Sequence, residues 1–272
     1  MIVSASALAA NIAATAHKLG TDLPKQYVAE IDSARRVVTA SGEIDGHTAS
    51  MNAAAMTALR ENRDPGADPN VQRLAALVTL SGNGIRHYAV EYASDIVTTA
   101  IAAHADTVLA GWGEAIRGDL DVLQGAAEVL DVPKLDAADP LMLKRANHLG
   151  VWADATTAAD RADLAMTGVR TLLTALHANA DPEYRVMMLA PDCSLDHFIA
   201  ANARTGPREL NAWVIARTGA PLRLITSVTE YTAAAGRISA ARQEQQRQAD
   251  EAEAEAEPRR RNRTRTWQPV PR

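Results

Sequence analysis

Five arginines near the C-terminal end of the chain form its densest group of side chains suited to ligand binding. With a nearby tryptophan, the group comprises Arg259, Arg260, Arg261, Arg263, Arg265 and Trp267. Guanidinium groups pair with phosphates and an indole ring stacks on bases, so this composition is typical of nucleic-acid contacts. Six acidic residues between positions 244 and 257 lie close by, and within about one Debye length they partly neutralise the arginines. A solvated tail, or one that docks on an acidic protein surface, is therefore an equally good interpretation.

Cys193 and His197 have the spacing that best suits nucleophilic catalysis. They are four apart in PDCSLDHF, so on a helix beginning at Asp192 they share a face, where a helix N-terminus and an imidazole would activate the thiol. Catalytic pairs of this kind usually come from separate segments. The simpler interpretation makes Cys193 a small buried side chain, His197 a surface residue, and Asp192 or Ser194 the helix cap. We therefore expect no catalytic residue here.

Two segments contain side chains that bind metals in other contexts. One holds Asp45 and His47, and the other holds Asp192, Asp196 and His197. Neither spacing matches HExxH, a pair of CxxC motifs or an EF-hand loop. Since isolated histidines and aspartates usually serve structural roles, we expect neither a metal nor a cofactor.

Two other segments share features with nucleotide-binding or DNA-binding elements. SGNGIRHY, residues 81–88, places glycines before a helix, but it is neither a P-loop nor a GxGxxG motif and predicts a turn between helices. Residues 209–231 have the length of a helix-turn-helix, with Gly219 in the turn and Arg223 as the cation that would read bases. An ordinary helical hairpin explains the same residues.

A short heptad pattern predicts a self-association surface. Its apolar members recur at spacings of four and three residues and are Leu224, Val228, Tyr231, Ala235 and Ile238. The next positions, Arg242 and Gln245, are polar, and a free-standing coiled coil usually needs at least three or four heptads. We therefore expect this seam to pack on a neighbouring helix, most simply one from a second copy.

The composition predicts an all-α fold. Alanine, the strongest helix former, makes up about a fifth of the 272 residues, whereas phenylalanine and cysteine each occur once. The proportions of hydrophobic (47%) and charged (22%) residues are those of a globular protein. The excess of alanine, and of arginine over lysine, is typical of GC-rich genomes such as those of actinobacteria and their phages. We expect no disulfide, signal peptide or membrane-spanning helix.

Helix signals divide the first 180 residues. Ser4 and Gly20 are placed to bound a first helix, and a second runs from Pro24 to near Gly42. Further helices are expected at 48–61, 71–80, 85–110, 114–130, 140–149 and 151–179, with an exposed loop at 62–70. The GWG sequence at 111–113 should interrupt the longest of these helical stretches.

The C-terminal third is expected to form a helical hairpin, a long last helix and a charged tail. Residues 184–189 suggest a strand or an extended connector, followed by helices at 193–204 and 207–218 and a last helix after Pro221. Repulsion among the glutamates of 251–257, followed by Pro258, should end that helix and leave 258–272 disordered. We divide the chain into a helical core (1–190), a C-terminal helical segment (191–250) and an acidic-then-basic tail (251–272).

These features predict a non-enzymatic structural or assembly protein, an alanine-rich bundle that forms homo-oligomers through its helices. The basic tail would dock an acidic protein surface, or bind nucleic acid weakly and without specificity, and no membrane is involved. We expect a cytoplasmic protein, or one in the host cytoplasm or virion if a phage encodes it. A nucleic-acid-binding protein using the tail and residues 209–231 is the alternative, and an enzyme with a helical active site is the third.

Overall fold

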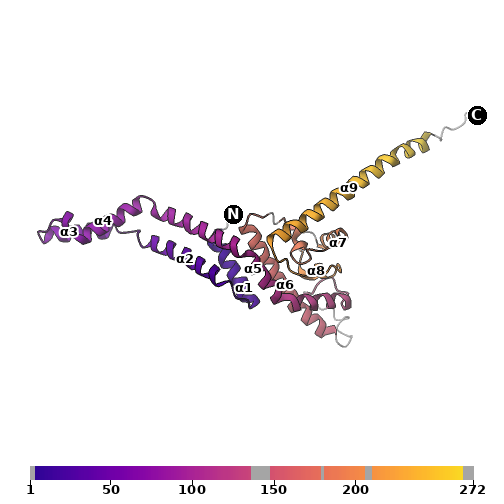
Figure 1. Ribbon diagram of the computed structural model, residues 1–272, viewed down its shortest axis with the longest axis horizontal. Coiled ribbons are helices and arrows are strands. Elements are labelled where there is room, and N and C mark those ends of the chain that lie inside the picture. The colour runs from indigo at the N-terminus through magenta and orange to yellow at the C-terminus, as the bar shows by residue number, and fades with distance from the viewer. Residues whose placement is uncertain (1–3, 136–147, 179–180, 206–209, 266–272) are drawn as a thin grey trace, which may run out of the picture. The chain divides into compact units, whose positions relative to one another are not determined.

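A computed structural model describes residues 4–135, 148–178, 181–205 and 210–265, with the backbone alone for residues 205 and 255–265. Every regular element among these residues is helical, which confirms the predicted all-α fold (Figure 1). The chain forms two compact units, Met1–Trp112 with Gly168–Ala178, and Gly113–Thr167 with Asn179–Arg272. These limits differ from the predicted boundaries at 190 and 250.

The first two helices of the N-terminal unit begin and end as predicted. Helix α1 (Ala5–Leu19) is capped by the Ser4 hydroxyl, which accepts a hydrogen bond from the N–H of Ala7, and it ends at Gly20 with a φ of 75°. Only glycine adopts that conformation readily, which explains the helix end. Helix α2 (Lys25–Gly42) follows Pro24. Together these helices contribute buried side chains that include Ile12, Leu19, Tyr27 and Ile31.

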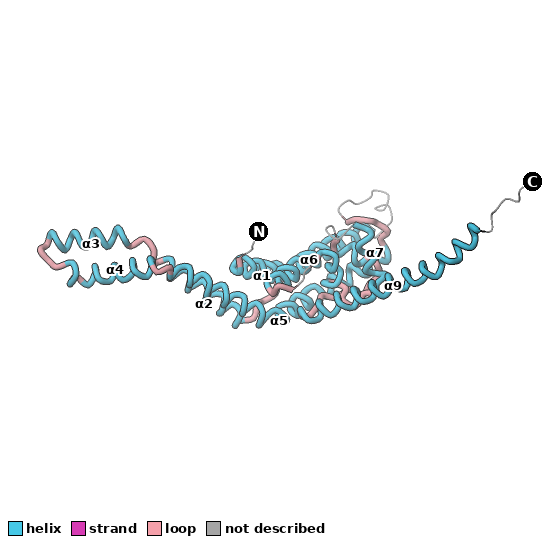
Figure 2. Tube along the Cα trace, turned by 90° about the horizontal axis from the view of Figure 1, so that it is seen from above, coloured by secondary structure: helices cyan, strands magenta, loops and turns pink. Residues whose placement is uncertain are grey.

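Helices α3 (Thr48–Arg60) and α4 (Pro69–Gly82) form a hairpin closed by the short 3-10 helix η1 (Pro65–Ala67). We call residues 48–82 the arm. Figure 2 shows α3 and α4 side by side, and in both views no other described helix of the N-terminal unit lies along them. The arm is therefore held to its own unit mainly at its base.

Helix α5 runs without a break from Ile85 to Val129, so the predicted interruption at GWG is wrong. The Trp112 side chain is only 1% exposed, and it packs so closely on α6 (His148–Ala175) that a Cβ at Gly168 would lie 2.7 Å from its ring. Two glycines cost a helix about 2 kcal/mol, a loss that burial of an indole ring can offset. Tertiary packing of Trp112 therefore outweighs the tendency of the two glycines to break the helix.

Helix α6 has the predicted alanine-rich stripe. The side chains at its three- and four-residue spacing are almost completely buried, and they include Ala155, Ala158, Ala162, Ala165, Val169 and Leu172. Small side chains let a helix approach its neighbours closely, and this explains why a core with a single phenylalanine can be dense. The predicted helix at 140–149 falls mostly outside the described residues.

The C-terminal unit combines short elements with one long helix. They are the 3-10 helix η2 (Pro182–Met188), α7 (Leu195–Thr205), α8 (Ala212–Ala216) and α9 (Val228–Arg265). The suggested strand at 184–189 is wrong, because most of that segment belongs to η2. The continuous apolar run that suggested a strand is explained by burial on all sides, since residues 186–190 are each at most 1% exposed.

Candidate interaction surfaces

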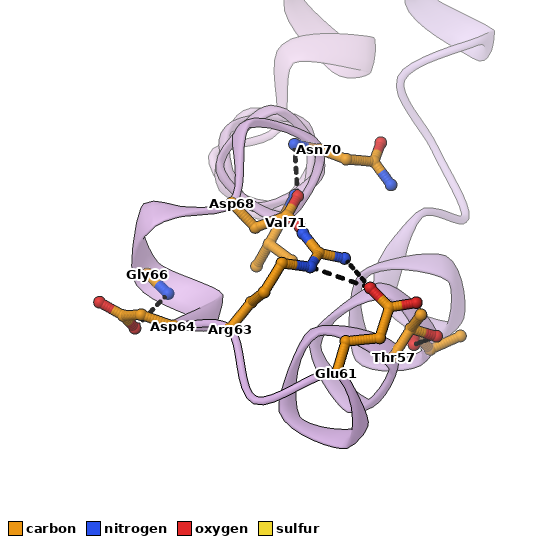
Figure 3. Close-up of polar contacts among 9 residues, drawn as sticks. Thr57, Glu61, Arg63, Asp64, Gly66, Asp68, Asn70 and Val71 are labelled. Atoms are coloured by element: carbon orange, nitrogen blue, oxygen red, sulfur yellow. Dashed lines mark hydrogen bonds and ion pairs between the residues drawn. The ribbon is translucent and has the colours of Figure 1, made fainter.

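A network of charged side chains closes the tip of the arm (Figure 3). Arg63 donates from Nε to Glu61 over 2.9 Å and also pairs with Asp68. Asp68 in turn accepts hydrogen bonds from the N–H groups of Asn70 and Val71, so it caps the first turn of α4. These bonds from Arg63 and the backbone hold the pKa of Asp68 below its ordinary range. The predicted loop at 62–70 is therefore exposed but well ordered.

Asp45 ties the base of the arm. Its carboxylate accepts hydrogen bonds from the Ser81 hydroxyl at 2.8 Å and from Arg86 at 2.9 Å. Both bonds lower the pKa of Asp45. His47 bonds through Nε2 to the carbonyl of Glu43. Asp45 and His47, which were considered as metal ligands, thus have structural partners. The SGNGIRHY segment forms the predicted turn between α4 and α5, and Gly84 in this turn has a φ of 74°.

Between its two polar ends the arm has almost no buried side chain and no charge. Only Ala58 and Leu74 are buried in α3 and α4, while Met56, Leu59 and Leu80 are 54%, 55% and 42% exposed. Residues 48–59 and 74–85 contain no Asp, Glu, Lys or Arg. At the 22% average of the chain these 24 positions would hold about five charged residues. We overlooked this signal in the sequence, although two uncharged runs of twelve residues flanking a charged turn are visible there.

The base of α9 is fixed to the C-terminal unit by hydrogen bonds and ion pairs. Ser227 caps the helix by accepting from the N–H of Glu230, and Glu230 reaches back to the N–H of Thr226 at 2.6 Å. Further along, Arg237 donates to the carbonyl of Pro191, and Arg242 pairs with Glu183 at 2.5 Å. Beyond this point the described side chains, from 242 to 254, are all exposed.

The backbone of α9 continues as helix past Pro258 to Arg265, so the predicted end at Pro258 is wrong. A proline removes one hydrogen bond, but the flanking residues are strong helix formers. We considered only the glutamate pairs, whereas Glu255 and Glu257 each precede an arginine by four residues, the favourable order for such pairs. The five arginines thus belong to a helical segment, while Trp267 lies outside the described residues.

The seam predicted for self-association is not one continuous helical stripe. Leu224 precedes α9, which begins at Val228. The extended segment before the helix pairs with the end of η2, because the backbone N–H groups of Arg223 and Ile225 donate hydrogen bonds to the carbonyls of Leu189 and Met188. Leu224, Tyr231 and Ile238 are 3%, 1% and 4% exposed, and Val228 and Ala235 are half-buried. Most of this surface already packs within the chain.

Residues 209–231 are not a helix-turn-helix. Helix α8 has five residues, all of them buried, and α9 starts eleven residues after α8 ends. Arg223, the cation considered for base reading, pairs with Asp192 and Glu230, each at 2.6 Å. A recognition helix presents base-contacting side chains near its N-terminus, and here the arginine considered for that role is engaged in two ion pairs.

Cys193 and His197 lack the geometry of a catalytic pair. Cys193 precedes α7, which starts at Leu195, and its side chain is 8% exposed. Burial raises the pKa of its thiol to about 11, opposite to the shift that activates a nucleophile. The His197 Nδ1 lies 3.5 Å from the N–H of Ser194, and Ser194 caps α7 as expected.

A cavity of about 290 Å³ in the N-terminal unit offers no catalytic group. It lies among α1, α2 and α5 and is lined mainly by small apolar side chains, with Arg35 at its edge. Its lining includes no carboxylate, histidine or cysteine. The phenol of Tyr27, also on α2, is buried, which raises its pKa to about 12, so it is not a base at neutral pH.

No described helix is long and apolar enough to cross a bilayer, and no three metal-ligating side chains come together in the part of the chain that is described. Comparison with protein-family models, with characterised proteins and with solved structures finds no match for the chain.

Proposed function

We propose that this chain is a non-enzymatic structural or assembly protein that self-associates through helices and docks a partner through the arginines of α9. The observation that supports this best is the arm, a pair of exposed helices that contain no charged residue at 48–59 or 74–82. Exposed surface usually contains about 25–35% charged residues, and helices that lack them are typically covered by another molecule. Protein–protein contact, rather than chemistry on a small substrate, makes use of such a surface.

The end of α9 suits a second, electrostatic contact. Glutamates at 251, 253, 255 and 257 precede Pro258, and arginines at 259, 261, 263 and 265 follow it at equal intervals. If this segment of one copy lay antiparallel to the same segment of a second copy, the glutamates of each would lie opposite the arginines of the other. The acidic partner surface that the arginines need is thus present in the chain itself, and exposed pairs of this kind contribute about 0.2–1 kcal/mol each.

A nucleic-acid-binding role is the second candidate, and the same five arginines favour it. Neutralising five phosphates gives a slope of log K against log salt of about −4 to −5. The glutamates should reduce this attraction, so we expect weak binding that is largely lost at physiological salt.

The alanine-rich and arginine-rich composition suits a phage product, and we place the protein in the cytoplasm or in a virion.

Sedimentation of the full-length protein over a wide concentration range tests the assembly role. We expect a mass that rises with concentration and persists at physiological salt, because the middle of the arm is uncharged. Fluorescence anisotropy with labelled DNA tests the alternative, and deletion of 259–272 should abolish whatever binding is found at low salt. A protein that stays monomeric and binds DNA tightly at physiological salt would contradict the assembly role.

A further inference from the structure

The cavity of the N-terminal unit lies where three helices meet and each carries an alanine. Helix α1 contributes Ala9, α2 contributes Ala34 and α5 contributes Ala93, and each of these is at most 4% exposed. Small side chains usually let helices approach until the space between them closes. Here the helices leave a space of about 290 Å³, whereas voids larger than a water molecule are rare in protein interiors. A space of this size is suited to holding another molecule.

The cavity has an apolar interior and a polar mouth. Val97 and Ile31, which are 3% and 6% exposed, belong to the buried part of its lining. Arg35 and Thr39 are exposed and line both the cavity and a shallow hollow along α2, so the cavity opens to solvent beside them. Ser6 of α1 adds a second hydroxyl to the lining. A molecule that fills this cavity therefore needs an apolar part for the interior and a polar part near Arg35.

Arg35 determines which charge that polar part should have. Among the described residues that line the cavity, it is the only one with a charge. Its ion pair with Asp32 spans 3.2 Å, and the two side chains are 64% and 48% exposed. Exposed pairs of this kind contribute little, so the guanidinium group can bond an anion at the mouth at small cost. A carboxylate fits best, because it accepts two parallel hydrogen bonds from a planar guanidinium group.

The volume of the cavity limits the length of the apolar part. An engineered cavity of about 150 Å³ in another protein binds benzene, so a cavity of about 290 Å³ accommodates an unbranched chain of about eight to ten carbons. We propose that this cavity binds the alkyl chain of a medium-chain fatty acid, whose carboxylate pairs with Arg35. The lining residues belong to α1, α2 and α5, so this site does not depend on the proposed assembly role.

A series of fatty acids tests whether the chain enters a cavity of limited size. Isothermal titration calorimetry of the full-length protein with sodium decanoate, below its micelle-forming concentration, should show one site per chain. Affinity should fall about tenfold from decanoate to octanoate, because each methylene group withdrawn from an apolar site weakens binding about fourfold. From decanoate to tetradecanoate the gain should be small, because the cavity is then full. An affinity that keeps rising with chain length would indicate an open surface and overturn the proposal.

Arg35→Gln tests the role of the charge at the mouth. It should weaken decanoate binding at least about fivefold, because it removes a charge-assisted hydrogen bond, and it should leave binding of decanol unchanged. Lys25→Gln is the matched control, since it removes one positive charge from an exposed position at the start of the same helix. Both ligands should bind this control as they bind wild type. Equal weakening of decanoate binding in the two variants would show that only net charge matters, and would overturn the proposal.

Substitutions that fill the cavity test where the chain binds. Ala34→Leu on α2 should abolish binding of both decanoate and decanol, because the larger side chain occupies the space that the alkyl chain needs. Ala93→Leu on α5 should do the same from another wall, so either variant that remains folded by circular dichroism is sufficient. A folded variant that binds decanoate as tightly as wild type would overturn the proposal. The fatty-acid series and Arg35→Gln require no change in the core.

Two further results would contradict the inference, and both are distinct from failure of the proposed function. A wild-type protein that binds neither decanoate nor decanol would overturn the inference. If such a protein gains binding when residues 1–3 are removed, the chain's own N-terminal residues, which precede the helix that carries Ser6 and Ala9, fill the cavity instead. Sedimentation of the same samples tests assembly separately. A protein that binds decanoate but stays monomeric would support this inference and contradict the assembly role.

Discussion

The arm and the core of the C-terminal unit are both rich in apolar residues, but they differ in how many of these residues are buried. By this core we mean residues 186–190, α7, α8 and the first turns of α9. Every residue of 186–190 and of α8 is buried, whereas α3 and α4 together bury only Ala58 and Leu74. The core is complete within one chain. The arm is a helical hairpin with stable polar ends and an apolar middle that its own chain leaves open.

The same difference explains how each region uses its charges. In the C-terminal core, arginines pair across elements, as when Arg223 joins Asp192 to Glu230. In the arm, the charges gather at the ends, where Arg63, Asp68 and Asp45 fix the turn and the base. In the C-terminal core, ion pairs therefore connect separate elements. In the arm, the charged residues lie only at the two ends, and the surface between them is uncharged.

The largest expected effect comes from the core. Trp213 is 2% exposed, and its indole N–H donates to the carbonyl of Val132 at 3.1 Å. Trp213→Ala should reduce the free energy of unfolding by about 3–5 kcal/mol, because it leaves a large cavity and an unpaired carbonyl. Urea denaturation followed by circular dichroism measures this loss. A loss below about 1 kcal/mol would show that the core is looser than the arm.

The corresponding change in the arm should have a smaller and local effect. Leu74→Ala removes the one large buried side chain of α4, and we expect a loss of about 2 kcal/mol, near the low end for such changes, because the surroundings can relax. Hydrogen exchange should speed up in residues 48–82 and remain unchanged in the C-terminal unit. Met56→Ala, at a position 54% exposed, is the control and should change little. Faster exchange throughout the chain would show that the arm is not an independent element.

A buried carboxylate makes the core sensitive to pH. Asp163 accepts the N–H of Ala212 at 2.8 Å, and burial raises its pKa to about 6, from an ordinary value of about 3.9. Since the folded state disfavours the ionised form, the stability of the unit falls as pH rises from about 4 to about 6. Asp163→Asn keeps the acceptor and removes the charge, so its stability relative to wild type should rise by about 2 kcal/mol over this range, because each unit of pKa difference corresponds to about 1.4 kcal/mol. A difference that does not vary with pH would contradict this assignment, and Asp196→Asn, at an exposed position of α7, is the control.

The smallest effect is expected at the tip of the arm. Asp68→Asn keeps a helix-capping acceptor but loses the ion pair with Arg63, whereas Asp68→Ala loses both. Because the pKa of Asp68 is lowered in the folded state, its stabilisation is present above about pH 4 and is lost as pH falls below that. Hydrogen exchange of residues 62–72 should therefore be fastest in the alanine variant, intermediate in the asparagine variant and slowest in wild type. Equal rates in the two variants would assign the whole effect to capping.

Local signals in the sequence predicted most helices and several of their ends. Ser4 and Gly20 bound α1 as expected, and the alanine stripe of α6 is buried as expected. The errors arose where a distant residue outweighed a local preference. Burial of Trp112 beside Gly168 keeps α5 continuous through its glycines, and pairing with Met188 and Leu189 keeps Leu224 out of α9.

What the sequence determined by itself is the helical content, the positions of most caps and the separation of charged from uncharged segments, because propensity, capping and charge depend on near neighbours along the chain. Only the tertiary structure decided which apolar faces are buried within the chain. The heptad spacing of Leu224 to Ile238 indicated a surface for another molecule, yet most of it is buried within the chain. The arm gave no such indication and is exposed. Periodicity shows that a face will be covered, but whether its own chain covers it depends on contacts between residues far apart in sequence.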